Sequence, residues 1–290
     1  MKLSELCKEI NLPQDVTERV LDEEKQMKAQ NKNTVPADLT SQLLRVCETH
    51  TKYLNKGIDE KIFTDTMKCF TRFIKECKDR TGKAEFDRGW WTHRQINMVL
   101  FRIGELEYEL TQSQGRNAVS VHIPSDAEFT PEKVDESLKQ AEEFMAEFYP
   151  DYKDVEYFCE SWLLSPRLGE IVKETSNIAK FQKRFRILED LPDDKEYMEW
   201  LFGAKADTPV QELPENTSLQ RKVRELLANG GNLGAAVGIM EKCAKLLTKT
   251  ITLKFAKQSK NTQNVEKNKK QTKEYENLLR INNQKHRLNM

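Results

Sequence analysis

Two side chains able to exchange protons lie in the two most strand-like segments of the sequence. Residues 118–124 alternate apolar and polar side chains and contain His122, whereas residues 155–164 are apolar on both faces except at Glu160 and Ser161. An imidazole titrates near neutral pH, so His122 could serve as a general base. Glu160 has apolar neighbours on its own strand face, a setting that raises the pKa of a carboxylate and suits it to acid–base catalysis.

These candidates and one aromatic pair also have ordinary structural explanations. His122 could form a local hydrogen bond at the end of its strand, and Glu160 could form an ion pair with Arg184 or Arg186. The tryptophan pair at residues 90–91 could line a ligand groove, although such a pair at a domain junction usually serves packing. The sequence leaves both interpretations open.

A serine or cysteine nucleophile has less support in the sequence. Ser161 lies outside any Gly-x-Ser-x-Gly turn and shares a strand face with Cys159, so both fit better as small core residues that let a helix approach. The six cysteines are scattered and contain no Cys-x-x-Cys pair. We therefore expect no metal site and no disulfide framework, but reduced thiols in a cytoplasmic protein.

The two strand-like segments are joined by one helix. After a polar loop, Thr130 and Pro131 provide a cap and a first helical residue, and an apolar stripe with spacings of three and four continues to Phe148. A strand–helix–strand unit predicts parallel neighbours with a right-handed crossover, and ligands usually bind beyond the carboxyl ends of such strands. The second strand should be covered on both faces, with Trp162 and Leu163 almost fully buried.

The remaining segments predict a helical bundle before this unit and mixed elements after it. Asp38 and Asp59 should cap helices that end at Gly57 and Gly82, and a shorter helix should cover residues 90–100. The alternating acidic segment 102–110 predicts a strand with one wet face. After residue 164 the patterns predict helices at 167–175, 193–202 and 219–227 and a strand at 183–188, and the glycine-rich run 230–239 could end in a last strand.

The net charge is zero but unevenly distributed. Residues 251–290 contain ten Lys/Arg and three Asp/Glu, so this tail carries +7 and the rest of the chain carries −7. An acidic body argues against nucleic-acid binding there. We expect a helical bundle in 1–98, a second domain in 99–240 and a basic tail in 241–290. No apolar run predicts a transmembrane helix, and the first residues lack the apolar core of a signal peptide.

Five ordered segments resemble one family. They are Phe101–Glu109, Val121–Pro124, Ser161–Pro166, Ser176–Phe181 and Leu213–Arg221. Together they resemble bacterial acyltransferase-domain proteins, which have a helical N-acyltransferase N-terminal domain followed by a C-terminal domain like the GNAT N-acyltransferases. The resemblance implies an α+β fold, a helical bundle followed by a GNAT-like mixed β-sheet flanked by helices. It also implies transfer of an acyl group from acyl-CoA to an amine on a small molecule or peptide.

On this basis we assign expected roles to seven residues. Catalysis would involve Glu160, His122 and Ser161, with Glu160 or His122 deprotonating the amine before it attacks the thioester directly. Acyl-CoA would be bound by Ser125, Trp162, Asn177 and Arg184.

One loop departs from the GNAT pattern. GNAT enzymes usually place a glycine-containing loop between the first of these strands and its helix, where backbone N–H groups hold the cofactor pyrophosphate. Here residues 125–131 contain no glycine and two acids, Asp126 and Glu128. We therefore predict weak coenzyme A binding in the usual pose. The rival hypothesis is a non-catalytic binding protein that keeps the fold without this loop, and an open gap between the two strands would favour the enzyme.

Overall fold

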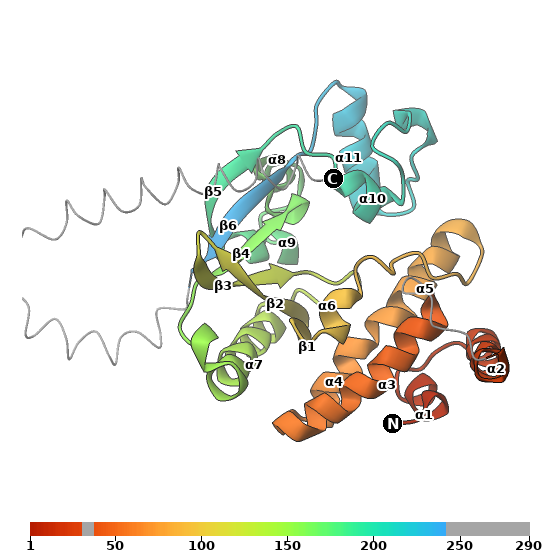
Figure 1. The fold of residues 1–290 in the computed structure, drawn as a ribbon. Coiled ribbons are helices and arrows are strands. Elements are labelled where there is room, and N and C mark those ends of the chain that lie inside the picture. The colour runs from red at the N-terminus through yellow and green to blue at the C-terminus, as the bar shows by residue number, and fades with distance from the viewer. Residues whose placement is uncertain (31–37, 242–290) are drawn as a thin grey trace, which may run out of the picture. The chain divides into compact units, whose positions relative to one another are not determined.

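The computed structural model describes residues 1–30 and 38–241 (Figure 1). Its contacts divide the chain into two compact units. Unit 1 contains residues 1–111, 119–155 and 198–207, and unit 2 contains residues 112–118, 156–197 and those from 208 onwards. The fold class is α+β, a helical N-terminal region followed by a mixed six-stranded sheet flanked by helices, as predicted.

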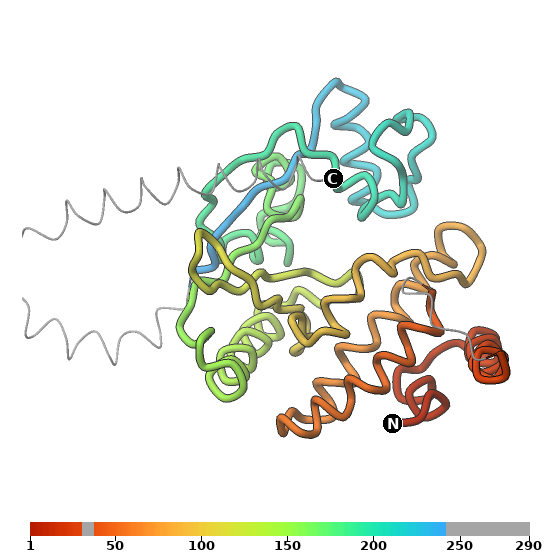
Figure 2. The backbone as a smooth tube through the Cα atoms, viewed as in Figure 1, coloured from red at the N-terminus to blue at the C-terminus, as the bar shows by residue number. Residues whose placement is uncertain are grey.

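Unit 1 begins with helices whose ends carry the expected signals. They are α1 (Leu3–Glu9), α2 (Gln14–Gln30), α3 (Leu39–Lys56), α4 (Glu60–Met67), α5 (Cys69–Thr81) and α6 (His93–Ile96). Asp38 accepts a hydrogen bond from the Ser41 amide, and Asp59 accepts one from the Lys61 amide. Gly57, with φ of 76°, ends α3 in the left-handed conformation that glycine adopts easily. The short connection from α3 to α4 can be followed in Figure 2.

Three details of the helical region differ from the sequence prediction. The helix expected from Asp59 to Gly82 is two helices, α4 and α5, separated at Lys68. Helix α2 continues to Gln30, although the polar run from Lys25 to Thr34 in the sequence predicts a loop. The helix expected over 90–100 is reduced to the single turn α6, because Met98 adopts a φ of 59°, outside the right-handed helical region.

The acidic segment after α6 is a hairpin and not one strand. Strand β1 (Leu100–Ile103) pairs antiparallel with β2 (Leu106–Ser113), with Leu100 opposite Glu109. The turn between them uses Gly104, whose φ is 62°. Glu107 was expected on a wet face but is only 3% exposed, because Arg72 of α5 lies 2.7 Å from its carboxylate.

Strand β3 (Arg116–His122) leads through the loop into helix α7 (Pro131–Phe148). Thr130 caps α7 and Pro131 opens it, both as predicted. The buried face is rotated from the predicted stripe: Ser137 and Phe144 are buried, whereas Leu138 and Phe148 are only half-buried. Two aromatic rings of β1 and α7, Phe101 and Phe144, pack with their centroids 4.9 Å apart.

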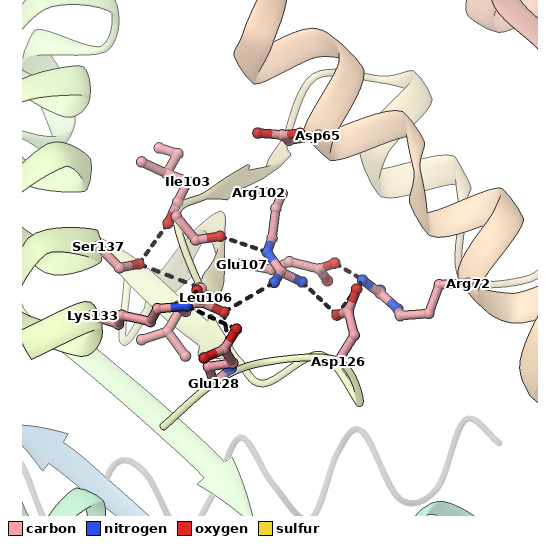
Figure 3. Close-up of polar contacts among 12 residues, drawn as sticks. Asp65, Arg72, Arg102, Ile103, Leu106, Glu107, Asp126, Glu128, Lys133 and Ser137 are labelled. Carbon is pink, nitrogen blue, oxygen red and sulfur yellow. Dashed lines mark hydrogen bonds and ion pairs between the residues drawn. The ribbon is translucent and has the colours of Figure 1, made fainter. Parts of the chain in front are cut away.

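The Ser137 hydroxyl joins α7 to the β1–β2 hairpin. It donates a hydrogen bond to the carbonyl of Ile103, accepts one from the Leu106 amide and lies 2.8 Å from the Tyr108 hydroxyl. Figure 3 shows Ser137 facing Ile103 and Leu106. At Gly104 a Cβ would lie only 3.0 Å from the Ser137 Cβ, so glycine permits this close approach.

Unit 2 is built around β6. Its elements are β4 (Tyr157–Ser161), the 3-10 turn η2 (Trp162–Leu164), α8 (Pro166–Ile171), α9 (Asn177–Gln182), β5 (Phe185–Leu191), the 3-10 turn η3 (Val210–Glu212), α11 (Ser218–Ala228) and β6 (Ala235–Met240), while α10 (Tyr197–Phe202) crosses into unit 1. Strand β6 is buried throughout and pairs antiparallel with β4 on one side and β5 on the other. Small side chains suit this central position because both neighbours pack closely on it.

The second predicted strand is shorter than expected. It ends at Ser161, and residues 162–164 form η2, in which Ser161 Oγ accepts a hydrogen bond from the Leu163 amide. Leu163 is buried as predicted, but Trp162 is only half-buried and packs against Leu191, Ala235 and Val237. The prediction of nearly complete burial of Trp162 is therefore wrong, because the chain turns at that residue.

Two expectations stay predictions. The pairing of residues 118–124 with 155–164, and any gap between them, involves both units. The basic tail lies, from residue 242 onwards, outside the described residues. In the described part of the chain, none of the helices is both long and apolar enough to cross a membrane.

Candidate functional site

His122 forms the centre of the candidate site in unit 1. It is the last residue of β3, and its Nε2 lies 2.8 Å from Oε2 of Glu109 on β2. The other Glu109 oxygen accepts a hydrogen bond from Nε of Arg94 at 3.1 Å. The His122 side chain is 25% exposed, so the imidazole is oriented by a carboxylate and still reached by solvent.

The contacts with His122 and Arg94 fix the protonation state of Glu109. Burial alone would raise the pKa of this carboxyl, but the hydrogen bond and charge of His122, together with Arg94, outweigh burial and lower the pKa below its ordinary value. Glu109 is therefore ionised at neutral pH and acts as an acceptor. When the imidazole donates Nε2–H to Glu109, its Nδ1 carries a lone pair.

One tryptophan ring packs on the imidazole, and two more tryptophans pack on that ring. The Trp91 ring packs edge-on to His122, with centroids 5.2 Å apart, and Arg94 lies over the Trp91 ring at 4.2 Å. Trp90 and Trp200 each pack edge-on against Trp91. The tryptophan pair considered in the sequence thus lies beside His122.

The other two catalytic candidates, Glu160 and Ser161, belong to unit 2. Glu160 is exposed on β4 and does not have the buried apolar setting that the sequence suggested. Ser161 uses its hydroxyl to cap η2. Cys159, on the same strand, is buried, and burial raises the pKa of its thiol, which disfavours the nucleophilic thiolate. Catalytic roles for Glu160 and Ser161 stay predictions.

The four expected cofactor residues lie in different surroundings. Ser125 is exposed and donates a hydrogen bond to Glu76. Trp162 is half-buried, as described above, Asn177 is exposed at the first position of α9, and the backbone carbonyl of Arg184 accepts a hydrogen bond from the Glu241 amide at 2.7 Å. Their binding roles stay predictions.

The loop between β3 and α7 is held by a network of charges, shown in Figure 3. Asp126 lies between two arginines: its Oδ1 is 2.9 Å from Nη1 of Arg102 and 3.6 Å from Nη1 of Arg72. Both arginine side chains are about nine-tenths buried, at 11% and 10% exposed. Burial would raise the pKa of Asp126, but Arg102 and then Arg72 lower it below its ordinary value. Glu128 pairs with Lys133 at 2.8 Å.

These contacts test whether the loop fits a cofactor pyrophosphate. Within the network, three cations (Arg72, Arg102, Lys133) face five carboxylates (Glu76, Glu105, Glu107, Asp126, Glu128). At the start of α7, Pro131 has no N–H and the Lys133 amide donates to Thr130. The excess of acids and these occupied positions do not fit the usual GNAT way of holding a pyrophosphate.

No group of three or more His, Cys, Asp or Glu side chains suited to a metal ion occurs within residues 1–30 and 38–241. In the same part of the chain the five cysteines are free.

Sequence reasoning found His122 but missed its partners. Glu109 was assigned to the wet face of a strand, and Arg94 to no role. The signal was present in the alternation of β2, which places Glu107 and Glu109 on one face, but only the pairing of β2 with its neighbour β3 in the sheet brings Glu109 to His122.

Comparison with known proteins gives two family matches. Residues 39–98 match the N-acyltransferase N-terminal domain, and residues 100–240 match the GNAT-like C-terminal domain. No curated protein is detectably similar to the chain.

Solved structures share the fold. An acyltransferase in complex with decanoyl-CoA and teicoplanin has a TM-score of 0.65 at 23% sequence identity, covering 70% of this chain, and this chain covers 65% of that one. An acyltransferase mutant in complex with octanoyl-CoA has a TM-score of 0.71 at 18% identity, covering 82% of this chain and 87% of that one. The resemblance noted in the sequence is confirmed: the chain is an acyltransferase-domain protein with an N-acyltransferase N-terminal domain in residues 39–98 and a GNAT-like C-terminal domain in residues 100–240.

Proposed function

We propose that this protein transfers an acyl group from an acyl-CoA to an amine, with His122 as the general base. The GNAT-like domain supports the reaction class, and the acyl-CoA complexes of proteins with the same fold support the donor. The observation that carries the assignment of His122 is its oriented ring: Nε2 is bonded to Glu109, and no hydrogen bond to Nδ1 is found among residues 1–30 and 38–241.

The chain's own residues account for the proton transfer. Nδ1 of His122 accepts the proton that the acceptor nitrogen loses as it forms its bond to the acyl carbon. Glu109 keeps the required tautomer and stabilises the imidazolium, and Arg94 keeps Glu109 ionised and in place. The acyl-CoA thioester supplies the acyl group: as the new C–N bond forms, the C–S bond breaks, and the coenzyme A thiolate that leaves takes a proton from the His122 imidazolium or from water. Because the β3–α7 loop does not fit its pyrophosphate, we assign no phosphate-binding residue there.

The direct test measures release of the coenzyme A thiol from acetyl-, octanoyl- and decanoyl-CoA with a panel of primary amines. His122→Gln should lower kcat by about 10²–10⁴-fold, the usual contribution of a general base. Glu109→Gln should lower kcat at least about tenfold, because the wrong tautomer becomes accessible.

His50 provides a matched control. Its Nε2 lies 2.9 Å from Glu60, so it repeats the histidine–glutamate geometry on α3 and α4. His50→Gln should leave transfer unchanged. If the wild type transfers acyl groups and His122→Gln is just as active, His122 is not part of the mechanism.

The rival function is a binding protein that keeps the GNAT-like fold without catalysis. The poor fit of residues 125–131 to a pyrophosphate favours it. Calorimetry separates the two: a wild type that binds amines or peptides but neither binds nor turns over any acyl-CoA would support the rival.

A further inference from the structure

Trp90 is a large apolar side chain left open to solvent beside the candidate site. It is 55% exposed, whereas Trp91 and Trp200, its neighbours in the aromatic group, are half-buried. Those two rings each have an arginine over them, Arg94 on Trp91 and Arg88 on Trp200. No such cation lies over Trp90 among the residues that the structure describes, so its ring is available to a ligand.

The position of Trp90 relative to His122 is limited by two measured distances. The Trp90–Trp91 centroids are 5.6 Å apart and the Trp91–His122 centroids are 5.2 Å apart, so the Trp90–His122 separation cannot exceed their total of 10.8 Å. Trp91 lies between the two rings in this chain of contacts. Among the described residues, Trp90 makes no ring contact with His122 itself, so a group resting on Trp90 is a second part of the acceptor and not its reacting nitrogen.

We infer that Trp90 binds a ring on the acceptor, so that the preferred substrate is an amine carrying a flat or pyranose ring, joined to the nitrogen by a spacer that bridges the Trp90–His122 separation. This inference rests on the proposed function. An exposed indole offers a ring face for stacking on an aromatic group or for packing on the apolar face of a sugar, and both share the same recognition chemistry.

Binding alone tests the ring preference first. Calorimetry on the full chain would use ω-phenylalkylamines of increasing length, aminoalkyl glucosides and alkylamines without a ring. The wild type should prefer one or both ring series, with an optimum spacer length. Trp90→Leu should weaken binding of that series about tenfold, remove the length optimum and change the affinity of alkylamines little.

Two further variants separate recognition from folding. Trp90→Phe keeps a ring and should restore most of the preference. Leu54→Ala is a matched control, because Leu54 is also 55% exposed in unit 1 but lies on α3. It should leave the preference intact. Equal affinities of ring and alkyl amines in the wild type, or a preference unchanged in Trp90→Leu, would overturn the inference.

Turnover distinguishes this inference from the proposed function. With an active wild type, Trp90→Leu should raise the KM of ring amines relative to alkylamines by about tenfold while kcat changes little, because a remote contact is made equally in the ground and transition states. A wild type that binds ring amines through Trp90 but transfers no acyl group would refute the proposed function and leave the binding site established. A wild type that transfers acyl groups without any preference for ring amines would support the proposed function and refute the binding site at Trp90.

Discussion

At the scale of single residues, Glu109 combines burial with ionisation. Its pKa in the folded protein lies below the ordinary value of 4.5, so its ionised form stabilises the fold above that value, and this contribution is lost as the pH falls through the folded pKa. We expect wild type to melt above Glu109→Gln near neutral pH, and the difference in Tm to shrink only below about pH 4.5. A difference that is constant down to pH 3 would show that the carboxylate charge does not contribute.

The negative charges of Asp126 and Glu128 determine how strongly the β3–α7 loop repels an anion. Two like charges at about 4 Å repel by about 4 kcal/mol at an effective dielectric of 20, or about a thousandfold in affinity. Pairing with Arg102 and Lys133 reduces that repulsion. We expect the change Asp126→Asn with Glu128→Gln to tighten acetyl-CoA binding by roughly tenfold in calorimetry, if the pyrophosphate binds at this loop.

Glu143→Gln provides the control for this double change, because Glu143 is exposed on α7 away from the loop. It should change the affinity little. Low-micromolar binding by wild type that weakens in the double variant would contradict the electrostatic account and strengthen the plain enzyme interpretation.

At the scale of elements, one ion pair joins α5 to β2. Arg72 and Glu107 are 2.7 Å apart, with side chains 10% and 3% exposed. Removing one partner leaves an uncompensated buried charge, so Glu107→Ala should lower the free energy of unfolding by about 3–5 kcal/mol in urea titrations. The double change Arg72→Met with Glu107→Leu should recover most of this loss. A double variant as unstable as the single one would mean that packing, not charge, sets the cost.

The elements also show what the sequence could predict. Caps and stop signals located the start of α3, the end of α5 and the start of α7 closely, because Asp38, Gly82 and Thr130 act through local hydrogen bonds and backbone conformation. The misses depend on distant partners. Burial of Glu107 requires Arg72, and the hydrogen bond that His122 donates to Glu109 requires β2 and β3 to be neighbours in the sheet. Neither partner is near in sequence, so no local pattern reveals it.

At the scale of the whole molecule, positive charge is concentrated in the C-terminal residues. Residues 251–290 carry +7, and the part from Lys257 onwards contains few apolar side chains to bury. Deleting residues 257–290 should therefore leave the Tm of the protein nearly unchanged in calorimetry. A clear fall in Tm would show that this segment contributes to the stability of the rest of the chain.

The rate at which the Leu106 amide proton exchanges with solvent depends on the Ser137 hydroxyl of helix α7. This amide is bonded to a side chain of α7, so its protection from hydrogen–deuterium exchange reports whether the helix is docked on the hairpin. Ser137→Ala should speed deuterium uptake at Leu106, which pairs with Ile103 beside the turn, more than at Tyr108, which pairs with Phe101 farther from the turn. Equal acceleration at both amides would mean that the hairpin opens as a whole. Measured in the presence of candidate acyl donors and acceptors, the same proton would tell whether a ligand tightens or loosens α7.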